Sequence, residues 1–217
     1  MLPPTTCHLP PTTSPPPTTS TPPTTSTPPS SSCVHLSCMT AYVASRHYRF
    51  AFPWTDPDDT PIWRAPEDSR AWMKSGGSHA YLYIQLHNES TWHALAIGPH
   101  LQWREDGAGD WASVGTNSAA AVYLLDAPHG TDGQDMDTGR LTEGGKVYST
   151  PGEYYDTSEQ MSASVGMAPD EVQDFAWCVA LGDAANEGSY YQFRVEYVYS
   201  SNNVYPEIAC VRGDRLG

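Results

Sequence analysis

The side chains that could do chemistry in this chain are carboxylates, histidines and cysteines. Acidic residues come in pairs at Glu67/Asp68 and Glu171/Asp174, and a pair of carboxylates is what acid–base hydrolysis of a glycosidic bond requires. The chain has no G-x-S-x-G, H-E-x-x-H, P-loop or dinucleotide-binding glycine motif. A chain with 25 acidic residues contains acidic pairs by composition alone, so these pairs are not evidence for an active site. Because no other catalytic motif is present, we expect a protein that is not an enzyme.

The histidines are spaced too widely for a compact metal motif, whose ligands lie only a few residues apart. The sequence places four of them six to eight residues from one another: His79, His87, His93 and His100. The acidic loop at 132–139 offers the carboxylate oxygens that Ca²⁺ takes, but without the spacing of an EF-hand. The candidate ligands are Asp132, Asp135 and Asp137. Aspartate and glycine are also typical of exposed turns, so a calcium site and a plain turn remain alternatives. No other cofactor is indicated.

Five cysteines allow either buried thiols or disulfides. They are Cys7, Cys33, Cys38, Cys178 and Cys210. No C-x-x-C occurs, and the spacing fits no zinc site. In an oxidising compartment an odd cysteine would remain for an intermolecular bond. We expect at least one disulfide, with Cys178 or Cys210 as the partners within the domain and Cys7 as the intermolecular one.

Residues 1–32 form a tail with its own composition. Of its 32 residues, 27 are Pro, Thr or Ser, and none is charged. A six-residue Thr/Ser/Pro repeat runs from Thr12 to Pro29. Such a segment cannot offset its ordering entropy by burying apolar side chains, and proline disfavours both helix and sheet. We therefore expect an extended tail at 1–32 and a single domain at 33–217.

Two interpretations of the tail remain open, a stiff linker and an O-glycosylated stalk. Ser/Thr-rich sequence with proline is the composition of mucin-like stalks. Polyproline II has three residues per turn, so a six-residue repeat presents the same face after two turns. The candidate glycosylation sites are Thr5, Thr6, Thr12, Thr13, Thr18, Thr19, Thr21, Thr24, Thr25 and Thr27.

In the domain, apolar residues alternate with period two, which is typical of strands buried on one face. The runs 173–181 and 190–198 alternate in this way, and a turn-rich segment at 182–189 joins them. One face of the first run carries Phe175, Trp177, Val179 and Leu181, and the expected inner face of the second carries Tyr191, Phe193, Val195 and Tyr197. We expect these two runs to form an antiparallel pair, and turns of helix only at 66–73 and 168–174. Further strands are expected at 42–52, 80–87, 94–103, 119–125, 146–149, 160–165 and 204–211, with Pro206 at an edge or bulge. This pattern predicts an all-β, antiparallel β-sandwich of the immunoglobulin-like or jelly-roll-like type.

Two tyrosine pairs and one sequon are candidate sites for sugars. Neighbouring residues on a strand point to opposite faces, so one ring of Tyr154/Tyr155 and one of Tyr190/Tyr191 should be buried. The other ring of each pair would be exposed for sugar stacking or for a subunit contact. Asn88-Glu89-Ser90 is an N-glycosylation sequon.

Four short motifs carry a resemblance to known proteins. They are Trp63-Arg64-Ala65-Pro66-Glu67-Asp68, Leu101-Gln102-Trp103-Arg104, Gln192-Phe193-Arg194-Val195 and Tyr205-Pro206-Glu207-Ile208. In this order they resemble a diffuse group of uncharacterised immunoglobulin-like β-sandwich domains in phage-like and bacterial surface proteins. The resemblance implies a sandwich with a structural or adhesive role, and it implies no catalytic residue.

Charge and hydropathy exclude several classes of partner. A net charge of −14 argues against nucleic acid, which is bound through Lys and Arg, and no apolar run is long enough to insert into a membrane. We expect a non-enzymatic structural subunit of an extracellular or particle-bound assembly, such as a filament or surface fibre. Its partners would be copies of itself in a homopolymer and the covalent glycans of the tail. The alternatives are a tethered carbohydrate-binding or adhesion module and a phage virion decoration protein.

Overall fold

The computed structural model describes residues 43–54, 56, 59–126, 130–137, 139–142, 151–155, 165–196, 198 and 203–212. All of them belong to the second of two units in the chain, Thr40–Gly217. The tail with its candidate threonines, three of the cysteines (Cys7, Cys33 and Cys38), the expected strand at 146–149 and most of that at 160–165 lie outside the described residues.

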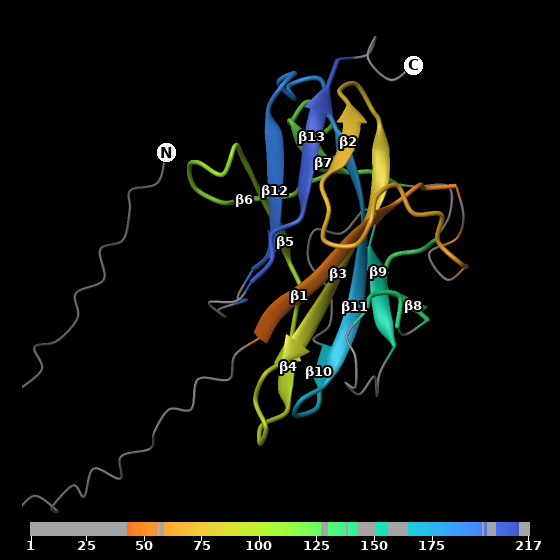
Figure 1. Cartoon of the computed structure of the whole chain (residues 1–217), viewed down its shortest axis with the longest axis vertical. Coiled ribbons are helices and arrows are strands. Elements are labelled where there is room, and N and C mark those ends of the chain that lie inside the picture. The colour runs from red at the N-terminus through yellow and green to blue at the C-terminus, as the bar shows by residue number, and fades with distance from the viewer. Residues whose placement is uncertain are drawn as a thin grey trace, which may run out of the picture. The chain divides into compact units, whose positions relative to one another are not determined.

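Every regular element of the described residues is a β-strand, and most strands belong to two sheets (Figure 1). Sheet A has the order β1 (Val43–Ala51), β3 (His79–Asn88), β11 (Val172–Leu181), β9 (Gly152–Tyr155) and β8 (Gln134–Met136), with β7 (Val122–Leu124) also paired to β11. Sheet B has the order β2 (Ala71–Lys74), β13 (Glu207–Val211), β12 (Tyr190–Val195), β5 (Leu101–Glu105) and β6 (Ala112–Ser113). A small third sheet pairs β4 (Leu95–Ile97) with β10 (Val165–Met167).

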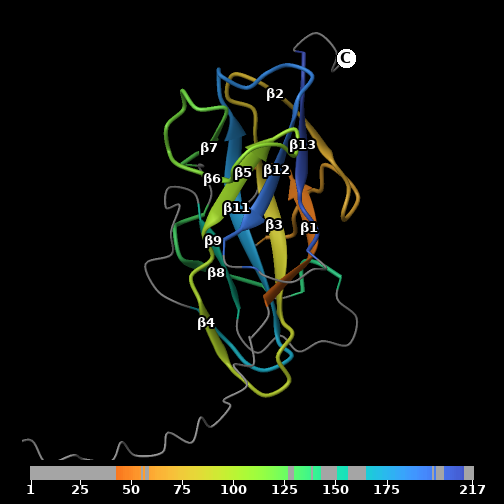
Figure 2. The same cartoon turned by 90° about the vertical axis from the view of Figure 1, so that its left-hand side faces the viewer.

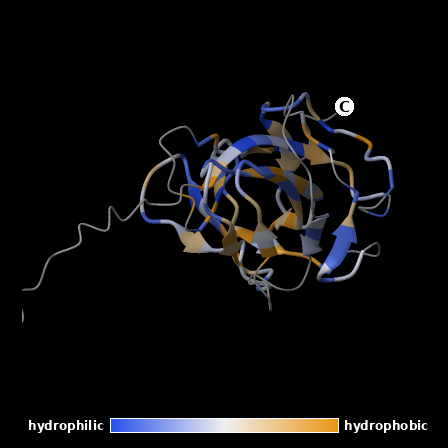
Figure 3. Ribbon diagram, turned by 90° about the horizontal axis from the view of Figure 1, so that it is seen from below, coloured by the Kyte–Doolittle hydropathy of each residue, from blue (hydrophilic) through white to orange (hydrophobic). Residues whose placement is uncertain are grey.

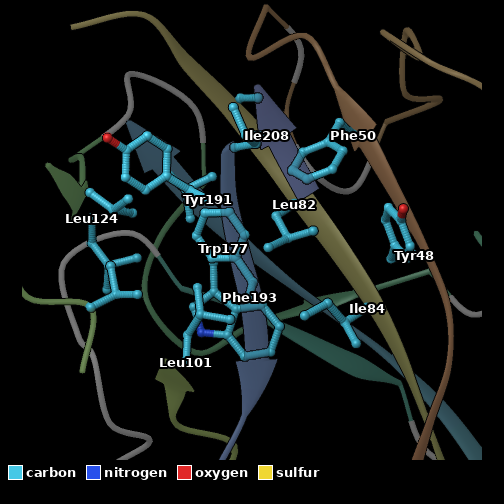
Figure 4. Close-up of a cluster of buried hydrophobic side chains, with 14 of the residues drawn as sticks. Tyr48, Phe50, Leu82, Ile84, Leu101, Leu124, Trp177, Tyr191, Phe193 and Ile208 are labelled. Carbon is cyan, nitrogen blue, oxygen red and sulfur yellow. The ribbon is translucent and has the colours of Figure 1, made fainter. Parts of the chain in front are cut away.

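The two large sheets pack face to face around the main hydrophobic core. In Figure 2, β5 and β12 of sheet B lie in front of β3 and β11 of sheet A. Figure 3, which looks along the domain, shows the strands curving around a common interior. Leu82 and Trp177 of sheet A meet Phe193 and Ile208 of sheet B in this core (Figure 4). Alternating strands of two sheets that bury their apolar faces against each other make a β-sandwich, so the all-β sandwich prediction is confirmed.

A second, smaller core lies on the other face of sheet A. Tyr81, Tyr83 and Cys178 pack there against Met136 of β8 and Leu141. Strand β11 is therefore covered on both faces, and all ten of its residues are buried. Strand β12 keeps one open face, so its burial alternates residue by residue.

The predicted pairing of the runs 173–181 and 190–198 is wrong. Strand β11 pairs with β3, β7 and β9, whereas β12 pairs with β5 and β13 in the opposite sheet. The segment 182–189 therefore crosses from one sheet to the other instead of closing a hairpin. The core faces of the two runs were predicted correctly, because Phe175, Trp177 and Phe193 all point into the main core.

The sheets are mixed rather than purely antiparallel. Strand β9 runs parallel to β11, and β2 runs parallel to β13. The expected helical turn at 66–73 is instead a turn followed by β2, and that at 168–174 leads into β11. Asp68 and Asp170 have left-handed φ values of 55° and 58°, which a right-handed helix cannot contain.

Two further strand predictions need correction. The run 94–103 is interrupted at 98–100 and forms β4 and β5 in different sheets, because Pro99 has no N–H to give to a ladder. Pro206 lies directly before β13, which is an inner strand between β12 and β2 rather than an edge strand.

Neither of the two described cysteines forms a disulfide. Cys178 on β11 points into the outer core of sheet A, whereas Cys210 on β13 points into the main core between the sheets. The two thiols are buried on separate sides of sheet A, so Cys178 and Cys210 are not bonded to each other. The other cysteines lie outside the described residues, and the expected disulfide stays a prediction. Within the described part of the chain, no helix is long and apolar enough to cross a membrane.

Candidate functional site

The outer face of sheet B carries the best-developed cluster of functional side chains in the described residues. It is the face that points away from the main core. Burial alternates along β12: Tyr190, Gln192 and Arg194 are partly exposed, while the residues between them are buried. Because strand register places directly opposite residues on the same face, the neighbouring strands extend this face in both directions.

A chain of hydrogen bonds crosses three strands of this face and ends just before a fourth. Arg104 on β5 donates from Nε and Nη2 to Gln192 Oε1 at 3.0 and 2.9 Å. Gln192 Nε2 in turn donates to Glu207 Oε1 at 2.7 Å. Glu207 Oε2 accepts from Arg70 Nε and Nη2 at 2.9 and 2.5 Å. Arg70 precedes β2, so the chain of bonds runs from β5 through β12 and β13 to the start of β2.

A second row repeats the arginine–amide pair beside the first. Arg194 Nε on β12 donates to Gln102 Oε1 on β5 at 2.8 Å. The ring of Trp111 covers both rows, because the guanidinium carbons of Arg104 and Arg194 lie 4.4 and 4.6 Å from its centroid. The ring of Tyr205 packs against Trp111, with 5.5 Å between the centroids. These cation–π contacts hold the arginines in fixed positions on the sheet.

An open groove of about 440 Å³ lies at the other end of the same face. Trp72 on β2 is directly opposite Ala209 on β13, which is opposite Tyr190 on β12. The small alanine leaves a depression between two aromatic rings. Trp72 is 56% exposed, and the Arg70 guanidinium stacks over Tyr190 at 4.7 Å. We call this depression the Trp72 groove.

The two tyrosine pairs differ in outcome. Tyr191 is fully buried in the main core and Tyr190 faces the Trp72 groove, as the alternation predicts. The same prediction is wrong for Tyr154 and Tyr155, which are both buried. Their side chains enter the outer and the main core respectively, because sheet A is covered on both faces.

The two carboxylates of the acidic pair Glu171/Asp174 bind different partners. Gln85 Nε2 donates to Asp174 Oδ1 at 2.9 Å, and the N–H groups of Arg140 and Leu141 donate to Oδ2 at 2.7 and 3.2 Å. Glu171 belongs to a separate network in which it accepts from the backbone N–H of Ala168. Burial raises the pKa of Asp174 to about 6, although these donors lower it. Asp174 thus fixes the segment that covers the outer core of sheet A.

The pair Glu67/Asp68 converges on one imidazole. His47 Nδ1 lies 2.7 Å from Asp68 Oδ2 and 3.3 Å from Glu67 Oε1. The other oxygen of each carboxylate accepts a backbone N–H, from Tyr48 at 2.9 Å and from Thr142 at 3.1 Å. Among the described residues, these three side chains are the group whose donor atoms lie close enough to share a metal ion. An ion pair between histidine and carboxylates explains the same geometry.

The other predicted sites lie apart from one another. His87 contacts Asp170 at 3.0 Å and His100 contacts Glu196 at 2.7 Å. Asp132, Asp135 and Asp137 lie on β8 and its flanking turn, and Asp137 pairs with Arg140 at 3.3 Å. The calcium site remains a prediction.

The sequon asparagine has a structural role. Asn88 is fully buried, and its Nδ2 donates to the carbonyl groups of His93, Met167 and Ala168 at 2.8, 3.3 and 2.9 Å. An amide nitrogen that is buried and bonded in this way is not accessible to a glycan in the folded domain.

Sequence reasoning did not single out Trp72, and it used the two motifs that contain the arginine–amide rows for a resemblance only, not as a binding site. One signal for the rows is present in the sequence, because the pattern Gln-aromatic-Arg occurs at 102–104 and again at 192–194. Antiparallel pairing places Trp103 opposite Phe193, so each Gln necessarily faces the Arg of the other strand. Trp72 has no such signal, since its exposure depends on Ala209 of a distant segment.

Comparisons with known proteins give no relative: no family model matches the chain, and neither does any curated protein or solved structure.

Proposed function

We propose that the chain is a non-enzymatic module at an extracellular or particle surface, and that it adheres to carbohydrate through the outer face of sheet B. The Trp72 groove is the observation that supports this function best. An exposed indole beside a tyrosine offers flat apolar faces with polar edges, which suits the C–H face of a pyranose ring. The neighbouring arginines, amides and Glu207 supply fixed donors and acceptors for hydroxyl groups.

In this proposal the sandwich is of the immunoglobulin-like type, and the tail at 1–32 is an O-glycosylated stalk. A polyproline II segment of this length would span on the order of 100 Å. Such a spacer would present the domain at a distance from the surface that carries it. The lack of charge in the tail and its Thr/Ser/Pro repeat support this role.

Affinity electrophoresis of the full chain in gels that contain a polysaccharide tests the proposal. We expect at least one neutral or acidic polysaccharide to retard the protein, and Trp72→Ala to abolish the retardation. Trp92→Ala is the matched control, because Trp92 is 80% exposed and lies after β3, outside sheet B. Retardation that is equal for Trp72→Ala and the unmodified chain would reject the groove as the binding site.

A structural subunit of a filament or surface fibre is the second candidate function, and a different patch supports it. Phe52 and Trp54 stack with their centroids 4.5 Å apart, and Trp54 is 65% exposed. Phe52 N donates to Ile62 O at 2.8 Å, which brings the 48% exposed Ile62 beside it. Contiguous exposed apolar side chains of this kind are commonly buried at subunit contacts.

Sedimentation velocity separates the two candidates. If the chain is a homopolymer subunit, Trp54→Ala should shift the population to monomer while Trp72→Ala leaves self-association unchanged. A monomeric unmodified chain at high concentration would argue against the homopolymer and leave adhesion as the function.

A further inference from the structure

We propose that the saccharide bound by the outer face of sheet B is acidic, and that Arg104 and Arg194 bind its carboxylate groups. This inference rests on the proposed function and specifies its ligand. It predicts a uronic acid polymer rather than a neutral polysaccharide.

The partners of the two arginines are the first argument. Arg104 bonds to the amide of Gln192 and Arg194 to the amide of Gln102, and neither forms an ion pair within the described residues. Arg46 and Arg70, by contrast, pair with glutamates at 2.6 and 2.5 Å. In a chain with 25 acidic and 11 basic residues, two neighbouring arginines with neutral partners keep a local positive charge on an otherwise acidic protein.

The second argument is the proximity of the two guanidinium groups. Both lie within 4.6 Å of the centroid of the same Trp111 ring, so two like charges are held close together. Their repulsion is unfavourable in the free protein. A bound anion between or beside them would remove this repulsion, which makes the site selective for negative charge.

The third argument is the number of donors that remain. A guanidinium group has five N–H donors in one plane. Arg104 uses Nε and Nη2, and Arg194 uses Nε, for bonds to glutamine oxygens. Stacking against Trp111 occupies a face of the guanidinium and consumes no N–H group. The remaining donors lie in the plane where a carboxylate accepts two parallel hydrogen bonds.

The arrangement also fits a chain-like ligand. Trp72 on β2 and Arg104 on β5 are separated by β13 and β12. With neighbouring strands about 4.8 Å apart, this separation is about 14 Å across the sheet. A short oligosaccharide that crosses the strands would therefore reach from the Trp72 groove to the arginine pair.

The test compares charged and neutral forms of the same polymer. The full chain is titrated with polygalacturonate, alginate and hyaluronate, and with methyl-esterified polygalacturonate, which keeps the sugar and loses the charge. We expect at least one acidic polymer to bind in a salt-dependent manner. If polygalacturonate binds, its methyl ester should bind at least tenfold more weakly.

Arginine variants locate the charge recognition. Arg104→Gln combined with Arg194→Gln should weaken binding to the acidic polymer at least tenfold. The same residues changed to lysine keep the charge but lose the planar fork, so this variant should lose less. Arg49→Gln is the matched control, because Arg49 also stacks on a tryptophan, Trp63 at 4.5 Å, but lies on sheet A. Thermal unfolding of each variant verifies that it is folded.

The outcomes distinguish the two proposals. The inference fails alone if Trp72→Ala abolishes binding, the arginine variants bind as tightly as the unmodified chain, and the methyl ester binds as tightly as polygalacturonate. Binding of neutral polysaccharides without binding of any acidic one would likewise reject the acidic ligand and leave carbohydrate adhesion standing. If no acidic or neutral polysaccharide binds, both this inference and carbohydrate adhesion are rejected.

Discussion

The outer faces of the two sheets have opposite roles in this sandwich. On sheet A the outer face is a second core, in which Tyr81, Tyr83 and Cys178 are covered by the segment that contains Met136 and Leu141. On sheet B the outer face is open, and its arginines, amides and aromatic rings bond mainly to one another. One face therefore stabilises the fold, and the other is free to contact a ligand.

The two faces also differ in how deeply their polar groups are buried, and therefore in how much the hydrogen bonds of these groups stabilise the fold. On sheet A the single carboxylate of Asp174 is enclosed by three N–H donors, because a buried charge without partners is very costly. On the outer face of sheet B the polar side chains other than the buried Gln102 keep partial access to water, so most bonds there contribute little to stability. We therefore expect equivalent substitutions to have large effects on sheet A and small effects on sheet B.

Removing a tyrosine ring from each face should give the largest contrast. Tyr83 is 1% exposed and packs edge-on against Trp63, so Tyr83→Ala should lower the free energy of unfolding by about 3–5 kcal/mol, as other aromatic truncations do in cores. Tyr190→Ala on the open face should cost less than about 1 kcal/mol. Urea denaturation of both variants measures the difference. Equal losses would show that the outer face of sheet B is also part of the core.

Gly152 on β9 provides the next test, because the backbone of β9 lies very close to that of Asp174 on β11 at this position. A Cβ atom at this position would lie 1.5 Å from the carbonyl oxygen of Asp174. Gly152→Ala should therefore destabilise the domain by about 3 kcal/mol, the upper end of the usual cost of overpacking. Gly166 is the control, since a Cβ there meets nothing within 4 Å. A neutral Gly152→Ala variant in urea denaturation would contradict the close pairing of β9 with β11.

Asp174 should give a smaller effect that depends on pH. Its pKa is raised from 3.8 to about 6, so the folded state binds the proton more tightly than the unfolded state. The contribution of this group to stability is fully present below about pH 4 and is lost as the pH rises through 6. A shift of about two pKa units corresponds to roughly 2–3 kcal/mol.

The Asp174→Asn variant should lose this part of the pH dependence, because its amide oxygen can still accept from Arg140 and Leu141 without titrating. Unfolding by urea between pH 4 and 8 checks the prediction. Asp183→Asn is the control, as Asp183 is exposed and should keep the profile of the unmodified chain. Parallel profiles for Asp174→Asn and the unmodified chain would mean that Asp174 does not titrate in this range.

The sequence by itself determined the all-β class and, in the runs 173–181 and 190–198, the side of the strand that faces the main core. Alternation in the run 190–198 placed Tyr191 inside and Tyr190 outside, as the structure has them. This prediction succeeds because side chains alternate between the two faces of a strand, so a strand with one buried face has alternating apolar and polar residues. The same rule failed for Tyr154 and Tyr155, because a strand that is covered on both faces has apolar residues on both and shows no alternation.

Only the tertiary structure decided which strands pair and which side chains meet. A connection such as 182–189 can close a hairpin or cross between sheets at similar entropic cost, so its length did not reveal that β11 and β12 lie in different sheets. The Trp72 groove needs Ala209 and Tyr190 from segments more than a hundred residues away. The face on which the proposed function rests is therefore a product of register between distant strands, which no local pattern in the sequence specifies.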